Sequence, residues 1–168
     1  KHSEADLMAE IIKINGNKAY TQVFESTRGL KVGTPVEFTG HMLEVTLGPG
    51  ILSKNFDGLQ NDLDKMTGVF LQRGEYTNPL EDEKLWEYTP IAKVGDIVSA
   101  GDWLGEVKEN WMPHKIMVPF KMKDEYTVVS IVEAGMYNIH KQIAVIKDED
   151  GNEYPLTMVQ KWPVKIPI

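Results

Sequence analysis

Residues 93–104, Lys-Val-Gly-Asp-Ile-Val-Ser-Ala-Gly-Asp-Trp-Leu, contain the same dipeptide twice, as Gly95-Asp96 and Gly101-Asp102. Each Gly-Asp pair favours a tight turn, because glycine adopts positive φ angles freely and an aspartate side chain can hydrogen-bond backbone two residues further on. Two such turns leading into short strands are typical of small, flattened β-barrels. This stretch therefore predicts a small, flattened β-barrel for its part of the chain.

Short strand-like runs separated by turn signals also dominate the rest of the sequence. Residues 43–47 alternate apolar and polar, which is the period of a half-buried strand, and Asn15-Gly16 favours a hairpin turn. Apolar residues at three- and four-residue steps predict one short helix, with a loop, within residues 53–66. The fold class is therefore mainly β, with little helix. The predicted strands are residues 7–14, 18–25, 36–38, 43–47, 69–72, 85–91, 115–118, 126–132, 143–147 and 154–158.

Composition argues against several classes of function. The 168 residues include no cysteine, which removes disulfides, zinc knuckles, thiolate catalysis and iron–sulfur ligation. A formal net charge of −7 disfavours binding to phosphate backbones and anionic lipid, so we expect no nucleic-acid partner. No apolar run approaches the roughly 20 residues of a membrane helix, so we expect no direct membrane insertion.

No segment carries a recognisable catalytic, nucleotide or metal site. A phosphate-binding loop needs Gly-Lys followed by Ser or Thr, and the sequence has no Gly-Lys pair. Gly48-Pro49-Gly50 is predicted to be a strand-ending turn, because proline removes a donor N–H. The histidines are scattered, and the acidic turn at residues 148–152 lacks the glycine and glutamate positions of a calcium loop. We therefore predict no catalytic residue, bound metal or cofactor in this chain.

A lysine suggests an alternative function. Residues 93–104, followed by 114–119 (HKIMVP), resemble biotinyl and lipoyl domains, in which a modified lysine lies on a hairpin tip. Lys115 would be that lysine, although biotinyl domains place it between two methionines and its neighbours here are His114 and Ile116. The alternatives left open are a stand-alone carrier or assembly module with Lys115 modified, and an unrelated β-rich binding domain.

Several segments, in order along nearly the whole chain, resemble the catalytic A subunits of V-type and A-type rotary ATPases and ATP synthases. They are residues 9–14 (AEIIKI), 21–33 (TQVFESTRGLKVG), 43–52 (LEVTLGPGIL), 56–60 (FDGLQ), 86–90 (WEYTP), 114–119 (HKIMVP) and 156–164 (LTMVQKWPV).

This resemblance implies a layout. Residues 1–47 would form a partial N-terminal β-barrel, and 48–66 would lead toward a nucleotide domain that is not in this sequence. Residues 67–159 would form the bulge insertion of barrel-sandwich architecture, and 160–168 would return toward the nucleotide domain. The family's opening strand, its phosphate-binding loop and its catalytic glutamate have no counterpart here. We therefore expect a fragment.

The resemblance also implies what the whole protein does. It would be an ion-translocating rotary enzyme that couples ATP synthesis or hydrolysis to proton or sodium transport, using MgATP and ADP. Its partners would be B subunits and further A subunits in an alternating hexamer, together with peripheral-stalk subunits, in the cytoplasmic head beside the membrane. The fragment alone is expected to make contacts and to be no enzyme. The expected contact residues are Trp103, Trp111, Arg73 and Lys84.

Overall fold

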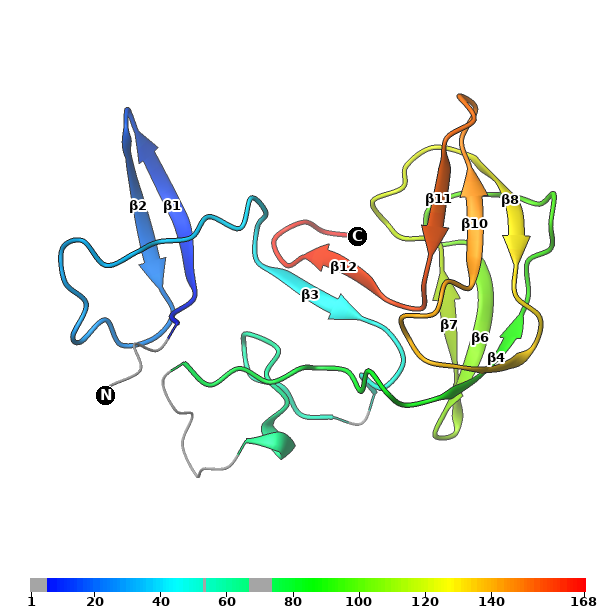
Figure 1. Ribbon diagram of the computed structural model, residues 1–168, viewed down its shortest axis with the longest axis horizontal. Helices are drawn as coiled ribbons and strands as arrows, with labels where there is room; N and C mark the ends of the chain where they lie inside the picture. Colours follow the sequence, from blue (N-terminus) through cyan, green and yellow to red (C-terminus); the bar gives the residue numbers. More distant parts are fainter. Residues whose placement is uncertain (1–5, 53, 67–73) are drawn as a thin grey trace.

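The computed structural model describes residues 6–52, 54–66 and 74–168, and these are almost entirely strand, turn and loop (Figure 1). A two-stranded ribbon of β1 (Ala9–Asn15) and β2 (Lys18–Val23) lies at one end of the long axis. A compact pair of sheets lies at the other end. Between them, β3 (Glu44–Leu47) pairs antiparallel with β12 (Gln160–Pro163). The predicted mainly β class is confirmed.

Two four-stranded antiparallel sheets form the compact part. The first has the order β11-β10-β8-β5, and the second has the order β7-β6-β4-β9. The first sheet consists of β5 (Ile97–Val98), β8 (Tyr126–Ile131), β10 (Ala144–Lys147) and β11 (Glu153–Leu156). The second sheet consists of β4 (Trp86–Pro90), β6 (Trp103–Glu109), β7 (Met112–Met117) and β9 (Gly135–Tyr137).

The buried core of the described residues belongs to this barrel-sandwich. One apolar cluster includes Leu104, Val118 and Ile146, and the other includes Tyr88 and Ile139. Tyr88 is fully buried and donates a hydrogen bond to the Leu104 carbonyl at 3.2 Å. Burial raises the pKa of this hydroxyl far above its usual value. Tyr88 therefore stays protonated and uncharged, and its ring packs in the core.

The two Gly-Asp turns form as predicted, with one difference. Gly95 and Gly101 have φ angles of +92° and +86°, in the region that glycine accepts without strain. Each aspartate accepts a hydrogen bond from the N–H three residues before it, at 2.8 Å from Lys93 and 2.7 Å from Ser99. The sequence predicts bonds to residues further along the chain instead. Each carboxylate thus bonds the backbone on the N-terminal side of its turn.

Other sequence predictions agree with the structure only in part. The segment 36–38 forms no strand: no pairing of the described strands includes it, and Val36 and Phe38 remain exposed. The helix within 53–66 is reduced to one 3₁₀ turn, Leu63–Lys65, capped by Asp62. Strands β5, β6, β9 and β12 have no counterpart among the predicted strands. The predicted strand 69–72 lies outside the described residues.

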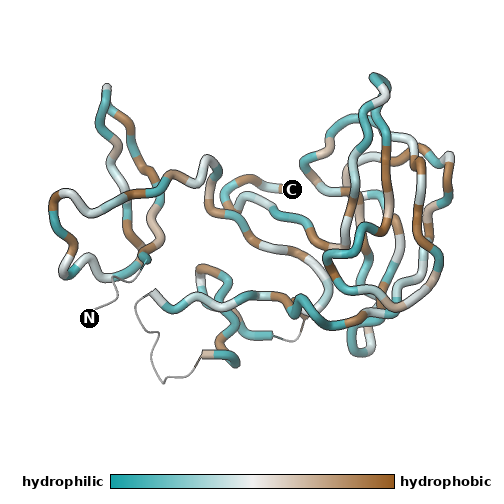
Figure 2. Tube along the Cα trace, in the orientation of Figure 1, coloured by the Kyte–Doolittle hydropathy of each residue, from teal (hydrophilic) through white to brown (hydrophobic). Residues whose placement is uncertain are grey.

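Residues 6–47, called here the ribbon region, contrast with the barrel-sandwich, since none of them is buried. Ile12, Ile14 and Phe38 are among its exposed apolar side chains, and Figure 2 shows hydrophobic positions spread along both strands. Its contacts to later residues are polar, such as those of the Glu25 carboxylate with the Gly74 N–H and the Tyr76 hydroxyl. The described part of this region closes no barrel, and the partial barrel stays a prediction.

Candidate interaction surface

Trp111 is the most conspicuous exposed side chain of the barrel-sandwich. It forms the tip of the β6–β7 hairpin with Asn110, whose φ of +56° makes the turn possible. Its side chain is 83% exposed. Large aromatic side chains usually stabilise a protein by being buried, and a solvent-exposed tryptophan at a hairpin tip does not. Tryptophan is enriched at binding hot spots. Trp111 is therefore the strongest candidate contact residue.

Trp103 lies at the opposite end of β6. It is 52% exposed, and the Lys115 ammonium lies 4.7 Å from its ring centroid. Strand rise separates the two ends of β6 by roughly 20 Å. Trp103 and Trp111 are both predicted contacts, but they do not belong to one compact patch.

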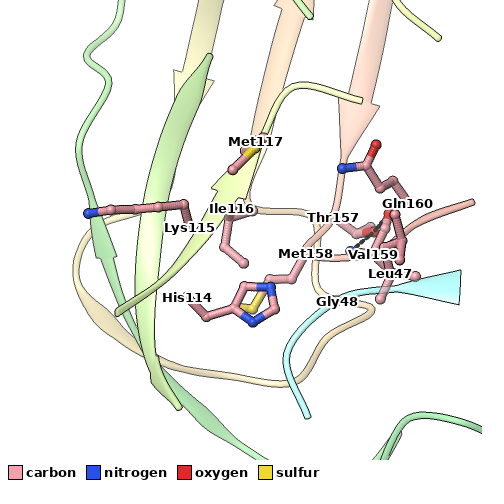
Figure 3. A pocket seen from close by; sticks show the side chains of 10 residues that line it. All are labelled: Leu47, Gly48, His114, Lys115, Ile116, Met117, Thr157, Met158, Val159 and Gln160. Atoms are coloured by element: carbon pink, nitrogen blue, oxygen red, sulfur yellow. Dashed lines mark hydrogen bonds between the residues drawn. The ribbon is translucent and has the colours of Figure 1, made fainter. Parts of the chain in front are cut away.

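Lys115 lies inside β7, directly opposite Glu106 on β6, and the two side chains form an ion pair. Figure 3 shows Lys115 extending away from the other labelled side chains. The hairpin tip carries Asn110 and Trp111 instead. The structure therefore does not place Lys115 where a carrier domain holds its modified lysine.

The two remaining predicted contact residues come from the segment before β4. Lys84 has its ammonium 4.2 Å from the centroid of the Trp86 ring, and Trp86 itself is buried. Lys84 and Asn110 line the same cavity, of about 190 Å³, so Lys84 lies near the base of the hairpin that carries Trp111. Arg73 lies outside the described residues.

The Gly48-Pro49-Gly50 turn joins β3 to the barrel-sandwich by close packing. A Cβ at Gly48 would lie 3.2 Å from both Leu80 Cδ1 and the Met158 carbonyl. Gly50 has a φ of +99°, and a Cβ there would lie 3.3 Å from Trp86 Cζ2. All three turn residues are buried. The turn is confirmed, and its small residues serve packing.

A buried carboxylate, which the sequence did not reveal, fastens this segment. Glu109 is 3% exposed, and its two oxygens lie 2.9 Å from the Leu52 amide nitrogen and 2.7 Å from His114 Nδ1. A buried carboxylate with both oxygens bonded is stable in the interior. Residues 50–52 are thereby tied to the base of the β6–β7 hairpin.

A small cavity beside this junction is lined by residues 47–48, 114–117 and 157–160 (Figure 3). Its volume is about 40 Å³. That is room for only a few water molecules, so this cavity is a packing gap between segments.

The FDGLQ motif, residues 56–60, builds a loop that caps β3. The Asp57 carboxylate accepts hydrogen bonds from the N–H groups of Leu59 and Asn61. Burial raises the pKa of Asp57, but these bonds and that of the Asn61 side chain outweigh it and lower the pKa. The Gln60 amide then bonds both the N–H and the carbonyl of Thr46, at 2.6 Å each. The free edge of β3 is therefore occupied by a side chain.

Next to this loop, Lys54 lies 3.1 Å from the buried Asp62 and 3.3 Å from Glu81. Burial raises the pKa of Asp62, but Lys54 outweighs it and holds that pKa below its usual value. Within the described residues no three His, Cys, Asp or Glu side chains are grouped to hold a metal ion. The described chain also has no helix long and apolar enough to cross a membrane.

Comparison with known proteins gives two family matches and a set of close relatives. Residues 77–165 match the barrel-sandwich domain of the ATP synthase alpha/beta subunits. Residues 1–40 match the beta-barrel domain of the ATP synthase alpha/beta family.

The relatives are V-type ATP synthase alpha chains. That of Borrelia garinii subsp. bavariensis is 50% identical over 171 residues, covering 100% of this chain and 30% of the relative. That of Chlamydia abortus is 48% identical over 165 residues, covering 97% and 28% respectively. The chain thus spans about 30% of the length of the curated relatives it matches.

Proposed function

The chain belongs to the ATP synthase alpha/beta family, and on that basis we propose that it is the contact-making part of a catalytic A subunit. The supporting observation is the identity of about one half along the whole chain to V-type ATP synthase alpha chains. The whole protein would couple ATP synthesis or hydrolysis to proton or sodium transport. It would work with MgATP and ADP in the cytoplasmic head of the complex.

The ribbon region would join neighbouring A and B subunits in a hexamer. Residues 6–47 leave Ile12, Ile14, Val36 and Phe38 exposed. A two-stranded ribbon is marginally stable alone, and exposed apolar patches mark protein contacts. The apolar side chains supply the area that such a contact needs.

The barrel-sandwich would contact the peripheral stalk through the hairpin tip. Trp111 supports this proposal because it presents a large exposed ring at the tip of a hairpin. Trp103 would belong to a separate contact, since it lies at the far end of β6.

Two substitutions in the full-length protein distinguish these surfaces. Trp111→Ala should weaken binding to purified stalk subunits at least tenfold, as for an aromatic hot spot, and leave hexamer assembly with B subunits unchanged. Ile14→Ser should impair assembly and leave stalk binding unchanged. Biolayer interferometry and native mass spectrometry measure the two properties. Loss of neither property in either variant would refute the proposal.

Lys115 should remain unmodified, because it is engaged with Glu106 and Trp103 inside a sheet. Intact-mass spectrometry after co-expression with biotin and lipoyl ligases measures this. A full-occupancy adduct on Lys115 would restore the carrier alternative.

A further inference from the structure

A polar cavity of about 190 Å³ lies where Gly50, Leu52 and Lys54 meet the barrel-sandwich. Its walls come from these three residues, from residues 81–86 and from the base of the β6–β7 hairpin. We propose that this cavity binds a carboxylate group, held by the Lys84 ammonium and the Trp86 indole N–H. The cavity lies near the base of the hairpin that carries Trp111, and the proposal does not depend on the contacts proposed above.

The cavity has two hydrogen-bond donors to spare. Trp86 is 5% exposed, and its buried Nε1 has no hydrogen-bond acceptor in the part of the chain that the structure describes. The Cζ2 edge of the same ring borders Gly50, which also lines the cavity. An unsatisfied buried N–H is unfavourable, so an acceptor at this position would be stabilising.

The second donor is the Lys84 ammonium. It lies over the Trp86 ring, and within the described residues no carboxylate forms an ion pair with it. Lys54, the other lysine of the cavity, is already shared by Asp62 and Glu81. Lys84 therefore carries the positive charge that remains available to a ligand.

The acceptors that line the cavity are engaged elsewhere. Both oxygens of Glu109 are bonded, to Leu52 and His114. Glu81 forms its ion pair with Lys54. The donors of Trp86 and Lys84 therefore need acceptor atoms from outside these residues.

The charge of the walls selects the kind of anion. Glu81 and Glu109 balance Lys54 and Lys84, so the cavity lining has no net charge. A phosphate dianion would meet more repulsion from the two glutamates than a singly charged carboxylate would. A carboxylate also offers two acceptor oxygens, one for each donor. It can belong to a free small acid or to an Asp or Glu side chain of a partner.

Nuclear magnetic resonance of the tryptophan indole N–H groups tests the proposal on the chain itself. Acetate, titrated at constant ionic strength against chloride, should shift the Trp86 signal saturably, with a Kd on the order of millimolar, about −4 kcal/mol. The other three indole signals should not follow the same curve. An amidated peptide with a single Glu side chain tests the partner source, and binding of either probe supports the site.

Three variants sharpen the test. Lys84→Met should weaken acetate binding roughly tenfold, since it removes a charge-assisted hydrogen bond. Lys123→Met, at another exposed lysine, should leave binding unchanged. Glu81→Gln should tighten binding, because it removes a repulsive charge. These variants alter exposed side chains and spare the buried Trp86.

Three results would overturn the proposal. One is a Trp86 signal that moves no further in acetate or in the Glu peptide than in chloride. Another is equal acetate binding by the Lys84→Met and Lys123→Met proteins. The third is tighter binding of phosphate than of acetate.

Discussion

Single residues at the junction between β3 and the barrel-sandwich have roles that no local sequence pattern indicates. Glu109 is buried on β6, as are Leu104 and Val107 nearby in the chain. An apolar side chain is the usual occupant of such a buried strand position. Its partners, Leu52 and His114, come from different segments. Because Leu52 is 57 residues away from Glu109 in the chain, no local sequence pattern indicates this hydrogen bond, and sequence reasoning missed it.

Glu109→Ala should lower the free energy of unfolding by about 1–3 kcal/mol, because it removes a buried acceptor and orphans the Leu52 N–H. Urea unfolding followed by tryptophan fluorescence measures the change. Glu106→Ala, at a partly exposed ion pair, serves as the control and should cost less than about 1 kcal/mol. Equal losses in the two variants would show that the Glu109 contacts are not stabilising.

Gly105 makes a second residue-scale prediction. A Cβ there would lie 2.4 Å from the Tyr88 ring and hydroxyl, and Tyr88 is fully buried. Gly105→Ala should therefore destabilise the protein by about 1–3 kcal/mol through overpacking. Gly58→Ala is the matched control, since a Cβ at Gly58 would meet nothing within 4 Å. Thermal unfolding of the two variants compares them, and a Gly105→Ala protein as stable as the control would contradict the packing described.

Among the strands and turns, the sequence predicted correctly those elements whose structure depends on residues close together in the chain. The Gly-Asp turns and the alternation of residues 43–47 predicted the turns and the strand β3 correctly. The 3₁₀ turn Leu63–Lys65 replaces the predicted helix because Asp57 bonds the N–H groups of Leu59 and Asn61 and folds a loop there. Strand β9 is three residues long and exists through its pairing with β4, which no local pattern encodes.

The contact role of Trp103, Trp111 and Lys84 stays a prediction. The exposure of Trp111 could be expected from the sequence, because this tryptophan stands in a turn-rich segment. The separation of Trp103 from Trp111 follows from the length of β6, whose bounds the sequence did not reveal. The cavity beside Lys84 depends on three distant segments and could be found only in the folded chain.

The elements should also differ in stability. Strands β8 and β10 flank an apolar cluster that excludes water, whereas β1 and β2 have no buried residue. Hydrogen exchange on the dilute protein should therefore protect the amides of β8 and β10 far more than those of β1 and β2. Residues 126–131 supply the reference within the same sample. Equal protection of both regions at low concentration would contradict the contrast in packing.

Across the whole molecule, the described residues divide into a compact barrel-sandwich and an extended, apolar but unburied ribbon region (Figure 1). This division suits a chain whose surfaces are completed by other subunits. The buried junction at Gly48–Gly50 and Glu109 then fixes the direction in which the chain leaves the barrel-sandwich. We infer that this chain supplies contacts, while nucleotide is bound elsewhere in the full-length protein.

Isothermal titration with MgATP examines this division of roles, with the full-length protein as the positive control. Phosphate binding needs a loop of aligned N–H groups, a lysine over the phosphates and a hydroxyl for magnesium, and the sequence has no such motif. The net charge of −7 also disfavours a polyanion. The chain should show no saturable heat up to roughly millimolar MgATP, a range worth about 4 kcal/mol. Saturable micromolar binding to the chain alone would contradict this division of roles.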